Sequence, residues 1–555
     1  MPENLELELA WDFVEKTDRS IFLTGKAGTG KTTFLHSLKS NSLKRLIVVA
    51  PTGVAAINAK GVTIHSFFQM PFGPILPEVA SLQKKETSFK HKFSKIKINI
   101  IKSLDVLIID EISMVRADLL DGIDQVLRRY RDRTKVFGGL QVLMIGDLQQ
   151  LAPVVKNNEW ELLKTYYNTP YFFSSKAFIE SATVNIELKH IYRQDNQRFI
   201  KILNEIRNNN LSDDSVTELN KRYLPDFTPK QDEGYITLTT HNGRANILND
   251  KELNKLKDKT QNYKAFIQGK FQENSYPTHE KLILKKGAQV MFIKNDSNSE
   301  KRYYNGKIGK IIALNKNEIR VHCQGDLEDI MVTPETWENV NYTLNPETKE
   351  ISENSVGSFS QMPLRLAWAI TIHKSQGLTF DKAIIDANAA FAHGQTYVAL
   401  SRCRTLGGIV LKNRIATESI ITDSRVTSFN NSVAENPPNQ FDLNNSQKVF
   451  QLNMVGELMN YYQFMFPVNR LIEIYNRNKN SFQGTIINPL IQIKEVGVQP
   501  ILVIANSFNK QLNDLCKDVV LPENNTVVLD RIHKAITYFI NHTEDKIKTP
   551  FETLT

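Results

Sequence analysis

Cysteine is scarce in this chain of 555 residues, and no two cysteines have the spacing of a metal site. The three that are present, Cys323, Cys403 and Cys516, lie far apart, which suits a reducing compartment. No apolar run approaches the roughly 18 residues of a membrane span, and the acidic N-terminal segment is unlike a signal peptide. We therefore expect a cytoplasmic protein with no membrane contact.

The composition is that of an ordinary globular chain, with 41% apolar and 23% charged residues. Its length predicts about three or four domains. The formal net charge is +9, which favours a polyanionic partner, although charge alone is a weak indication.

The most specific motif is a glycine-rich loop, GKAGTGKTT, between an apolar run and a helical pattern. Strand, loop and helix in this order predict a phosphate site, because loop N–H groups and the helix N-terminus bind phosphate oxygens. We expect Lys31 to reach the β- and γ-phosphates and Thr32 to hold Mg²⁺. The predicted ATP-binding residues of the loop are Gly25, Lys26, Ala27, Gly28, Thr29, Gly30, Lys31, Thr32 and Thr33.

Two further apolar runs are typical of buried strands, and each ends in polar groups. Val106–Ile109 is followed by Asp110 and Glu111, which fit an Mg²⁺ ligand and the group that polarises the attacking water. Val142–Ile145 leads to Gln150, whose amide could read a γ-phosphate. Paired acids that follow a phosphate loop by about 80 residues indicate hydrolysis rather than binding alone.

Polar and aromatic residues after other strands are candidates for nucleic-acid contact. They are Pro51, Thr52, Gly53, His65, Ser66, Phe67 and Phe68. Thr63–Phe68 could be a surface that touches bases and phosphates, or alternatively a core strand edge. The lysine-rich segment at about 66–102 is either a solvated face or a small insertion on the nucleic-acid path.

The run from Asp110 to Val154 resembles the Pif-type (petite integration frequency) DNA helicases of superfamily one. Met114–Gly139 is similar to that family's signature segment, and Gly25–Thr33, Ala50–Gly53 and Thr63–Phe68 match its earlier motifs. The resemblance implies ATP and Mg²⁺ as cofactors and 5′ to 3′ translocation on single-stranded DNA. Residues 1–20 lack the glutamine with which many relatives read adenine.

The same resemblance implies a second lobe that completes the site. Arg193 resembles the arginine that reaches ATP across the cleft, and Arg402 in LSRCR is expected to contact the γ-phosphate. Gly377 in HKSQG is added to the ATP site. The predicted catalytic residues are thus Lys31, Glu111, Gln150, Arg193 and Arg402. Further predicted DNA contacts are Thr240, Asn242, Thr371, His373, Lys374 and Ser375.

The expected fold is α/β, with two RecA-like P-loop motor domains built on parallel sheets. A small insertion belongs to the first lobe, a Src-homology-like β-barrel is inserted in the second, and the C-terminal extension is mostly helical. The expected boundaries are 1–185 for the first domain, 186–282 and 359–428 for the second, 283–358 for the barrel, 429–447 for a linker and 448–555 for the helical domain.

These expectations describe a nucleoid-associated helicase, monomeric on DNA, acting on single strands and single-strand/double-strand junctions. The resemblance extends the substrates to G-quadruplexes and RNA–DNA hybrids, in repair, recombination or telomere maintenance. Two alternatives are a RecD-like motor subunit of a recombination complex and a DNA-dependent ATPase adaptor without unwinding activity. Residues 448–555 carry no chemical motif and could bind an unknown protein.

Overall fold

The computed structural model describes residues 4–71, 73–77, 93–192, 196–230, 233–273, 276–296, 302–344, 351–386, 394–415, 423–481, 486–517 and 520–552. The chain forms two compact units, residues 1–10 with 20–437 and residues 11–19 with 438–555. Over the described ranges, no helix has the length and apolar character needed to cross a membrane.

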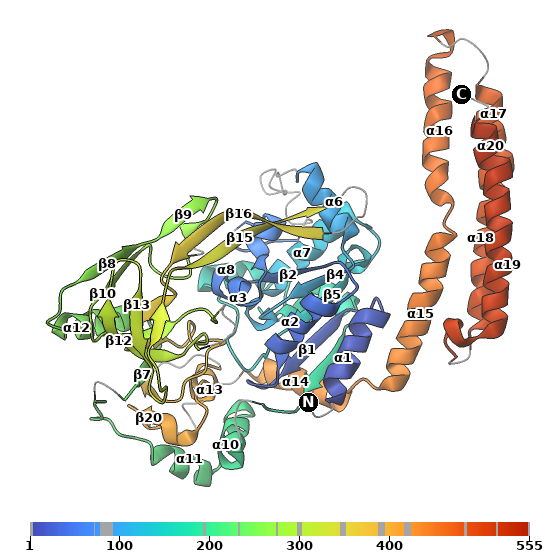
Figure 1. Cartoon of the computed structure of the whole chain (residues 1–555). Coiled ribbons are helices and arrows are strands. Elements are labelled where there is room, and N and C mark those ends of the chain that lie inside the picture. Colours follow the sequence, from blue (N-terminus) through green and yellow to red (C-terminus); the bar gives the residue numbers. More distant parts are fainter. Residues whose placement is uncertain are drawn as a thin grey trace. The chain divides into compact units, whose positions relative to one another are not determined.

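The first lobe is built on a six-stranded parallel sheet of order β3-β2-β4-β5-β1-β6 (Figure 1). Its strands are β1 (Ile21–Gly25), β2 (Leu46–Ala50), β3 (Val62–Thr63), β4 (Val106–Ile109), β5 (Gln141–Ile145) and β6 (Val184–Leu188). The central strands are continuous apolar runs, because both faces of a parallel sheet are buried. The carboxyl ends of β1 and β4 therefore open on one edge, where the glycine loop and the acids follow.

Helices join and cover these strands. They are α1 (Leu5–Lys16), α2 (Lys31–Asn41), α3 (Gly53–Asn58), α4 (Ile64–Phe68), α6 (Lys95–Ser103), α7 (Ala117–Tyr130), α8 (Asn157–Leu163) and α9 (Lys176–Glu180). One face of α7 places Leu120, Ile123 and Leu127 in the same apolar core as α4 and α6. The part of the basic segment at 78–92 lies outside the described residues.

The second lobe has a four-stranded parallel sheet of order β18-β7-β19-β20. Its elements are β7 (Ile236–Thr239), β18 (Ala369–Thr371), β19 (Ala383–Asp386), β20 (Ile409–Leu411), α10 (Gln197–Arg207), α11 (Asp213–Asn220), α12 (Asn242–Lys255) and α13 (Gln395–Ser401). Phe199, Ile202 and Ile206 of α10 are buried in one core with this sheet and α13. Parallel sheets in both lobes confirm the predicted α/β class.

An antiparallel region is inserted between β7 and β18. It comprises β8 (Gln261–Lys264), β9 (Phe266–Gly269), β10 (Lys281–Leu284), β11 (Gln289–Phe292), β12 (Ile308–Leu314), β13 (Ile319–His322), β14 (Ile330–Val332), β15 (Glu335–Leu344), β16 (Ile351–Gln361) and β17 (Leu364–Leu366). These strands form a five-stranded sheet, a three-stranded sheet and the pair β8–β10. The region is wider than the predicted 283–358, because β8, β9 and β10 pair here rather than with the parallel sheet. β15 lies against α6 of the first lobe (Figure 1).

The linker predicted at 429–447 contains the boundary between the two units, after residue 437, but two helices occupy most of it. α14 (Ser424–Glu435) buries Val426 in the core of the first lobe, where Phe429 stacks on Phe173 with ring centroids 4.5 Å apart. α15 (Gln440–Leu458) starts from Asn439, whose side chain accepts hydrogen bonds from two backbone N–H groups of its first turn. Asparagine and proline here mark a helix end and a helix start, not an extended connection.

The second unit is helical, as predicted for the C-terminal extension. Besides α15 it contains α16 (Tyr462–Arg477), α17 (Ile487–Gln492), α18 (Gln499–Leu515), α19 (Thr526–Thr543) and α20 (Thr549–Glu552). Residues 493–498 and 544–548 continue these helices as π-helical turns. Phe508 of α18 and Phe539 of α19 are buried in its core, and Tyr461 stacks on Phe539 at 5.5 Å.

Candidate nucleotide-binding site

The glycine loop lies between β1 and α2, as predicted. Gly25, Gly28 and Gly30 all have positive φ angles, and a side chain at Gly25 would come within 2.9 Å of the Leu188 carbonyl oxygen. Only glycine tolerates this backbone without strain. Lys31 begins α2, and its ammonium donates to the carbonyl oxygens of Gly25 at 2.5 Å and Lys26 at 2.9 Å. The loop therefore holds a lysine over the N-terminus of α2, a site with the chemistry to bind phosphate.

Asp110 and Glu111 follow β4 on the same edge of the sheet. Glu111 has φ 52 and ψ 44, a left-handed conformation that is uncommon for a residue with a side chain. Burial raises the pKa of both carboxyls, and the nearby ammonium of Lys31 acts in the opposite direction. Gln376 of the second lobe donates its amide to the Glu111 carboxylate at 2.8 Å. One candidate catalytic acid is therefore in direct contact with the other lobe.

The predicted metal ligands form a donor set that fits Mg²⁺. Thr32 is exposed at the start of α2, and Asp110 is partly exposed at the end of β4. No cluster of three His, Cys, Asp or Glu side chains with the placement of a metal site occurs among the described residues. Mg²⁺ does not require one, because it usually takes one or two protein oxygens together with phosphate oxygens and water.

Gln150 lies in the loop after β5 and joins the two lobes. Its amide nitrogen donates to Asp147 at 3.1 Å, and its amide oxygen lies 3.5 Å from a guanidinium nitrogen of Arg402. Arg402 is only 2% exposed, although it carries a charge. The structure thus brings together Gln150 and Arg402, two of the predicted catalytic residues.

The loop is also in contact with the second lobe through Tyr397 of α13. The Ala27 N–H donates to the Tyr397 hydroxyl at 3.0 Å. Burial and the neighbouring Asp147 raise the pKa of Tyr397 to about 12, so this hydroxyl is neutral. No sequence pattern indicates this contact, because its partners are 370 residues apart.

Arg207 is a second residue that sequence reasoning missed. It is the last residue of α10, and it forms ion pairs with Asp147 at 3.5 Å and Glu187 at 3.3 Å. In the sequence it is one arginine in a helical pattern, and no motif marks it. Of the remaining predicted ATP-site residues, Arg193 lies outside the described residues, and Gly377 is exposed in the turn after Gln376.

The predicted DNA contacts in the first lobe divide into exposed and buried side chains. Ser66 is exposed, and His65, Pro51 and Gly53 are partly exposed. Thr52 is also partly exposed, and its hydroxyl caps α3 by accepting from the Ala55 N–H. For Phe67 and Phe68 the prediction is wrong: they are 1% and 0% exposed, because α4 turns both rings into the core. The Lys97 ammonium lies 3.6 Å from the Phe67 ring centre.

The second lobe shows the same division. His373, Lys374 and Asn242 are exposed, and Thr240 is partly exposed. Thr371 and Ser375 are buried, unlike the exposed side chains expected of DNA contacts. The Thr371 hydroxyl accepts from the Lys374 N–H and the Ser375 hydroxyl donates to the Ile372 carbonyl. These two hydroxyls therefore stabilise the turn that presents His373 and Lys374.

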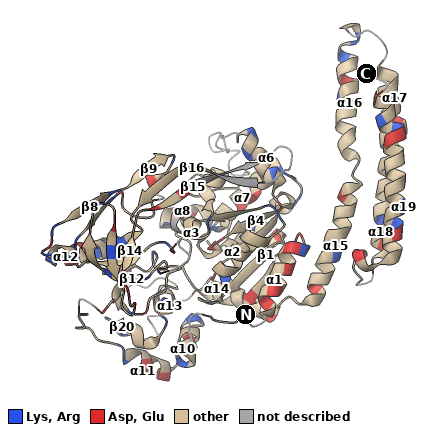
Figure 2. Cartoon of the chain, viewed as in Figure 1, with Lys and Arg blue, Asp and Glu red and all other residues tan. Residues whose placement is uncertain are grey.

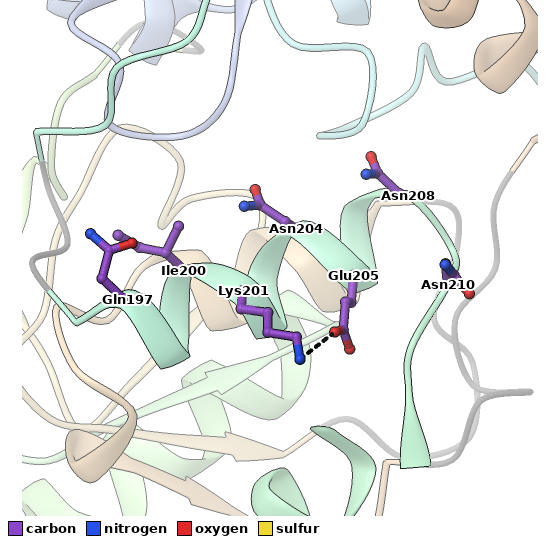
Figure 3. Close-up of a pocket in the computed structure, with 7 residues that line it drawn as sticks. All are labelled: Gln197, Ile200, Lys201, Asn204, Glu205, Asn208 and Asn210. Carbon is purple, nitrogen blue, oxygen red and sulfur yellow. Dashed lines mark ion pairs between the residues drawn. The ribbon is translucent and has the colours of Figure 1, made fainter. Parts of the chain in front are cut away.

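A separate hollow of about 270 Å³ is lined by residues of α10 and of the segment that follows it. Figure 3 shows the seven residues that line it, among them the Lys201–Glu205 ion pair. The lining residues are Gln197, Ile200, Lys201, Asn204, Glu205, Asn208 and Asn210. None of them was predicted as a site residue, and none belongs to the glycine loop after β1.

Two family models match the chain. Residues 8–217 match the PIF1-like helicase model, and residues 442–555 match the model described as DNA helicase, middle domain. A curated relative, the ATP-dependent DNA helicase Pif1 of Psychrobacter sp., is 32% identical over 71% of this chain and 66% of its own length. The protein of the same name from Campylobacter jejuni is 30% identical over 72% of this chain and 89% of its own length. The chain thus spans just under two thirds of the Psychrobacter relative.

Solved structures of Bacteroides sp. Pif1 are 42% identical to this chain and cover 78% of it. The complex with ADP-AlF4 superposes with a TM-score of 0.72 and is covered to 96% of its length. The complex with ADP-AlF3 and single-stranded DNA superposes with a TM-score of 0.57 and is covered to 98%. This chain therefore superposes better on the ADP-AlF4 complex than on the complex with ADP-AlF3 and single-stranded DNA.

Proposed function

Because this chain belongs to the PIF1-like helicase family, we propose that it is an ATP-dependent DNA helicase that moves 5′ to 3′ on single-stranded DNA. The observation that carries the proposal is the pairing across two parallel-sheet lobes. Lys31, Asp110 and Glu111 lie on one edge of the first lobe, and Gln376 and Arg402 reach it from the second. A phosphate site that is shared between two lobes couples hydrolysis to their relative movement.

In this proposal, the residues of the first lobe bind and activate. Lys31 neutralises the charge of the β- and γ-phosphates, and the loop from Gly25 to Thr33 surrounds them with N–H groups. Glu111 orients the attacking water and accepts its proton. Thr32 and Asp110 would hold Mg²⁺, and the bound ion would neutralise part of the phosphate charge.

The second lobe responds to the γ-phosphate. Arg402 stabilises the charge that develops during phosphoryl transfer, and Gln150 of the first lobe orients the γ-phosphate. Arg193 and Gly377 complete the site. The Tyr397 hydroxyl occupies the Ala27 N–H, a donor that a phosphate oxygen would use. Nucleotide binding at the loop therefore affects a contact of α13, the helix that ends at Arg402, and links the loop to movement of the second lobe.

DNA runs over the exposed polar groups of both lobes. We assign contacts with backbone phosphates to Thr52, Gly53, Ser66, His373 and Lys374, which fits a motor that does not read sequence. Bacteroides Pif1 has been solved with single-stranded DNA and at forked double-stranded DNA, and these complexes support single strands and junctions as substrates here. G-quadruplexes, RNA–DNA hybrids and a nucleoid location are further parts of the proposal.

The second unit is proposed to bind another protein rather than to track DNA. Residues 438–555 contain 11 Lys and Arg and 11 Asp and Glu, so their formal net charge is zero. Figure 2 shows both signs along these helices. A surface without excess positive charge lacks the main source of affinity for a DNA backbone.

Strand displacement on three matched duplexes tests the function. One duplex carries a 5′ tail, one a 3′ tail and one no tail, and each is incubated with ATP and Mg²⁺. We expect unwinding of the 5′-tailed duplex alone and none by Lys31→Ala. Unwinding from the 3′ tail would refute the polarity. DNA-stimulated hydrolysis without unwinding would favour the adaptor, or a RecD-like subunit that requires its complex.

A further inference from the structure

Arg207 is a buried charge at the boundary between the two lobes. It is the C-terminal residue of α10, whose apolar face packs in the core of the second lobe. Arg207 is 7% exposed, and its guanidinium pairs with two carboxylates of the first lobe. Glu187 belongs to β6, and Asp147 to the loop after β5. Arg207 is thus fixed in one lobe and paired in the other.

The ion pair with Asp147 is part of a continuous series of contacts. One carboxylate oxygen of Asp147 forms the ion pair with Arg207 at 3.5 Å, and the other accepts from the Gln150 amide at 3.1 Å. The Gln150 amide oxygen then faces Arg402 at 3.5 Å. Asp147 also accepts from the Gln149 N–H, which fixes the loop that carries Gln150. The series therefore runs from α10, through a first-lobe loop, to the end of α13 in the second lobe.

The buried carboxylate of Asp147 needs a positively charged partner, and Arg207 supplies it. Asp147 is 1% exposed, and an isolated buried carboxylate is strongly unfavourable. The neighbouring carboxylates Asp147 and Glu187 raise the pKa of Arg207 despite its burial, while burial and Arg207 lower the pKa of Lys26. A guanidinium has the planar fork to meet two carboxylates at once, which an ammonium lacks.

We propose that Arg207 is a positioning residue, which holds Asp147 so that Gln150 stays aligned with Arg402 and with the γ-phosphate. When the second lobe moves, α10 moves Arg207, and the Asp147 loop carries this change to Gln150. Arg207 touches neither nucleotide nor water in this role. The inference rests on the proposed ATPase function, and it adds a connection between the lobes that no sequence motif marks.

Single-turnover ATP hydrolysis in the presence of single-stranded DNA tests this role. We expect Arg207→Gln to slow hydrolysis about tenfold, the scale on which members of one ion-pair network are coupled. Binding of a fluorescent ATP analogue should change less than about twofold, since Lys31 and the loop are untouched. Arg198→Gln is the matched control, because Arg198 lies on the same helix in an exposed ion pair with Glu218. It should hydrolyse at the wild-type rate.

A double-mutant cycle separates positioning from a structural role. If Arg207 acts through Gln150, adding Arg207→Gln to Gln150→Ala causes no further loss of rate. Multiplied losses would overturn the proposal. Arg207→Lys replaces Arg207→Gln in this test if Arg207→Gln does not fold, because lysine keeps the positive charge but not the planar guanidinium. We expect Arg207→Lys to lower the rate of hydrolysis partially in the wild-type background and not to lower it further in the Gln150→Ala background. A wild-type protein without ATPase activity would instead refute the proposed function.

Discussion

The two lobes use the same architecture for different kinds of chemistry. In the first lobe, the loop after β1 and the acids after β4 present backbone N–H groups, a half-buried lysine and an exposed threonine. In the second lobe, two arginines that contact first-lobe groups, Arg402 and Arg207, are buried to 2% and 7% exposure. The first lobe is therefore built to receive a ligand, whereas the second is built to be held in place by the first.

The difference follows from the cost of burying charge. A guanidinium removed from water is stable only when its hydrogen-bond partners are nearby, and here many of these partners lie in the opposite lobe. A change in the distance between the lobes therefore changes the energy of both arginines. An exposed group such as Thr32 has no such dependence, because water replaces a partner that moves away. The buried arginines thus make the second lobe sensitive to the state of the first.

The largest expected effect is on the rate of hydrolysis, and it separates the ligand-binding role of the first lobe from the role of the buried arginines of the second. Arg402→Ala should lower the rate of hydrolysis by about a thousandfold or more, because an arginine that stabilises the γ-phosphate contributes on this scale. Nucleotide affinity should remain close to wild type. Lys31→Ala should abolish hydrolysis and also weaken binding. Rapid-quench hydrolysis and titration with a fluorescent ATP analogue measure the two quantities separately.

The distinction between the two lobes fails if Arg402→Ala and Lys31→Ala lose nucleotide affinity to the same extent. Arg404→Ala is the control, since Arg404 is an exposed neighbour that pairs with Asp381 outside the site. Its hydrolysis rate should stay within about twofold of wild type, as for most surface substitutions.

Local patterns predicted the first lobe well. The expected strand Val106–Ile109 matches β4 to the residue, and Val142–Ile145 matches β5 except for its first residue, because each is a short apolar run bounded by polar groups. The loop from Gly25 to Thr33 also lies where the motif placed it. In these cases the information is contained in neighbouring residues.

Contacts between distant segments were not predictable. Arg207 meets Glu187 and Asp147 across 20 and 60 residues, and Tyr397 meets Ala27 across 370. No spacing rule relates such positions. Phe429 falls in the predicted linker, although its ring stacks on Phe173, because asparagine-rich composition hides the apolar face of α14.

A second prediction concerns the buried part of the expected DNA surface. Phe68→Ala should destabilise the first lobe by about 3–5 kcal/mol, since it leaves a cavity where a fully buried ring was packed. DNA affinity of the folded protein should not change. Urea unfolding and fluorescence anisotropy with single-stranded DNA measure these effects. Phe137→Ala is the matched control, with an equally buried ring in the same core. A loss of DNA affinity in Phe68→Ala alone would restore the interpretation of Phe68 as a DNA contact.

The smallest effect is expected at Lys374, whose exposed ammonium follows the buried Thr371 on the turn after β18. Lys374→Ala should weaken binding of single-stranded DNA several-fold, equally for all sequences, and reduce the salt slope by about 0.7, the value for a single phosphate. Stability should not change, because water replaces an exposed ammonium at little cost. Lys221→Ala, an exposed lysine of the same lobe paired with Glu218, should leave the slope at its wild-type value. An unchanged slope in Lys374→Ala would place the DNA path elsewhere on the second lobe. A reduced slope would place Lys374 on the DNA path, at the turn that the buried hydroxyls of Thr371 and Ser375 stabilise.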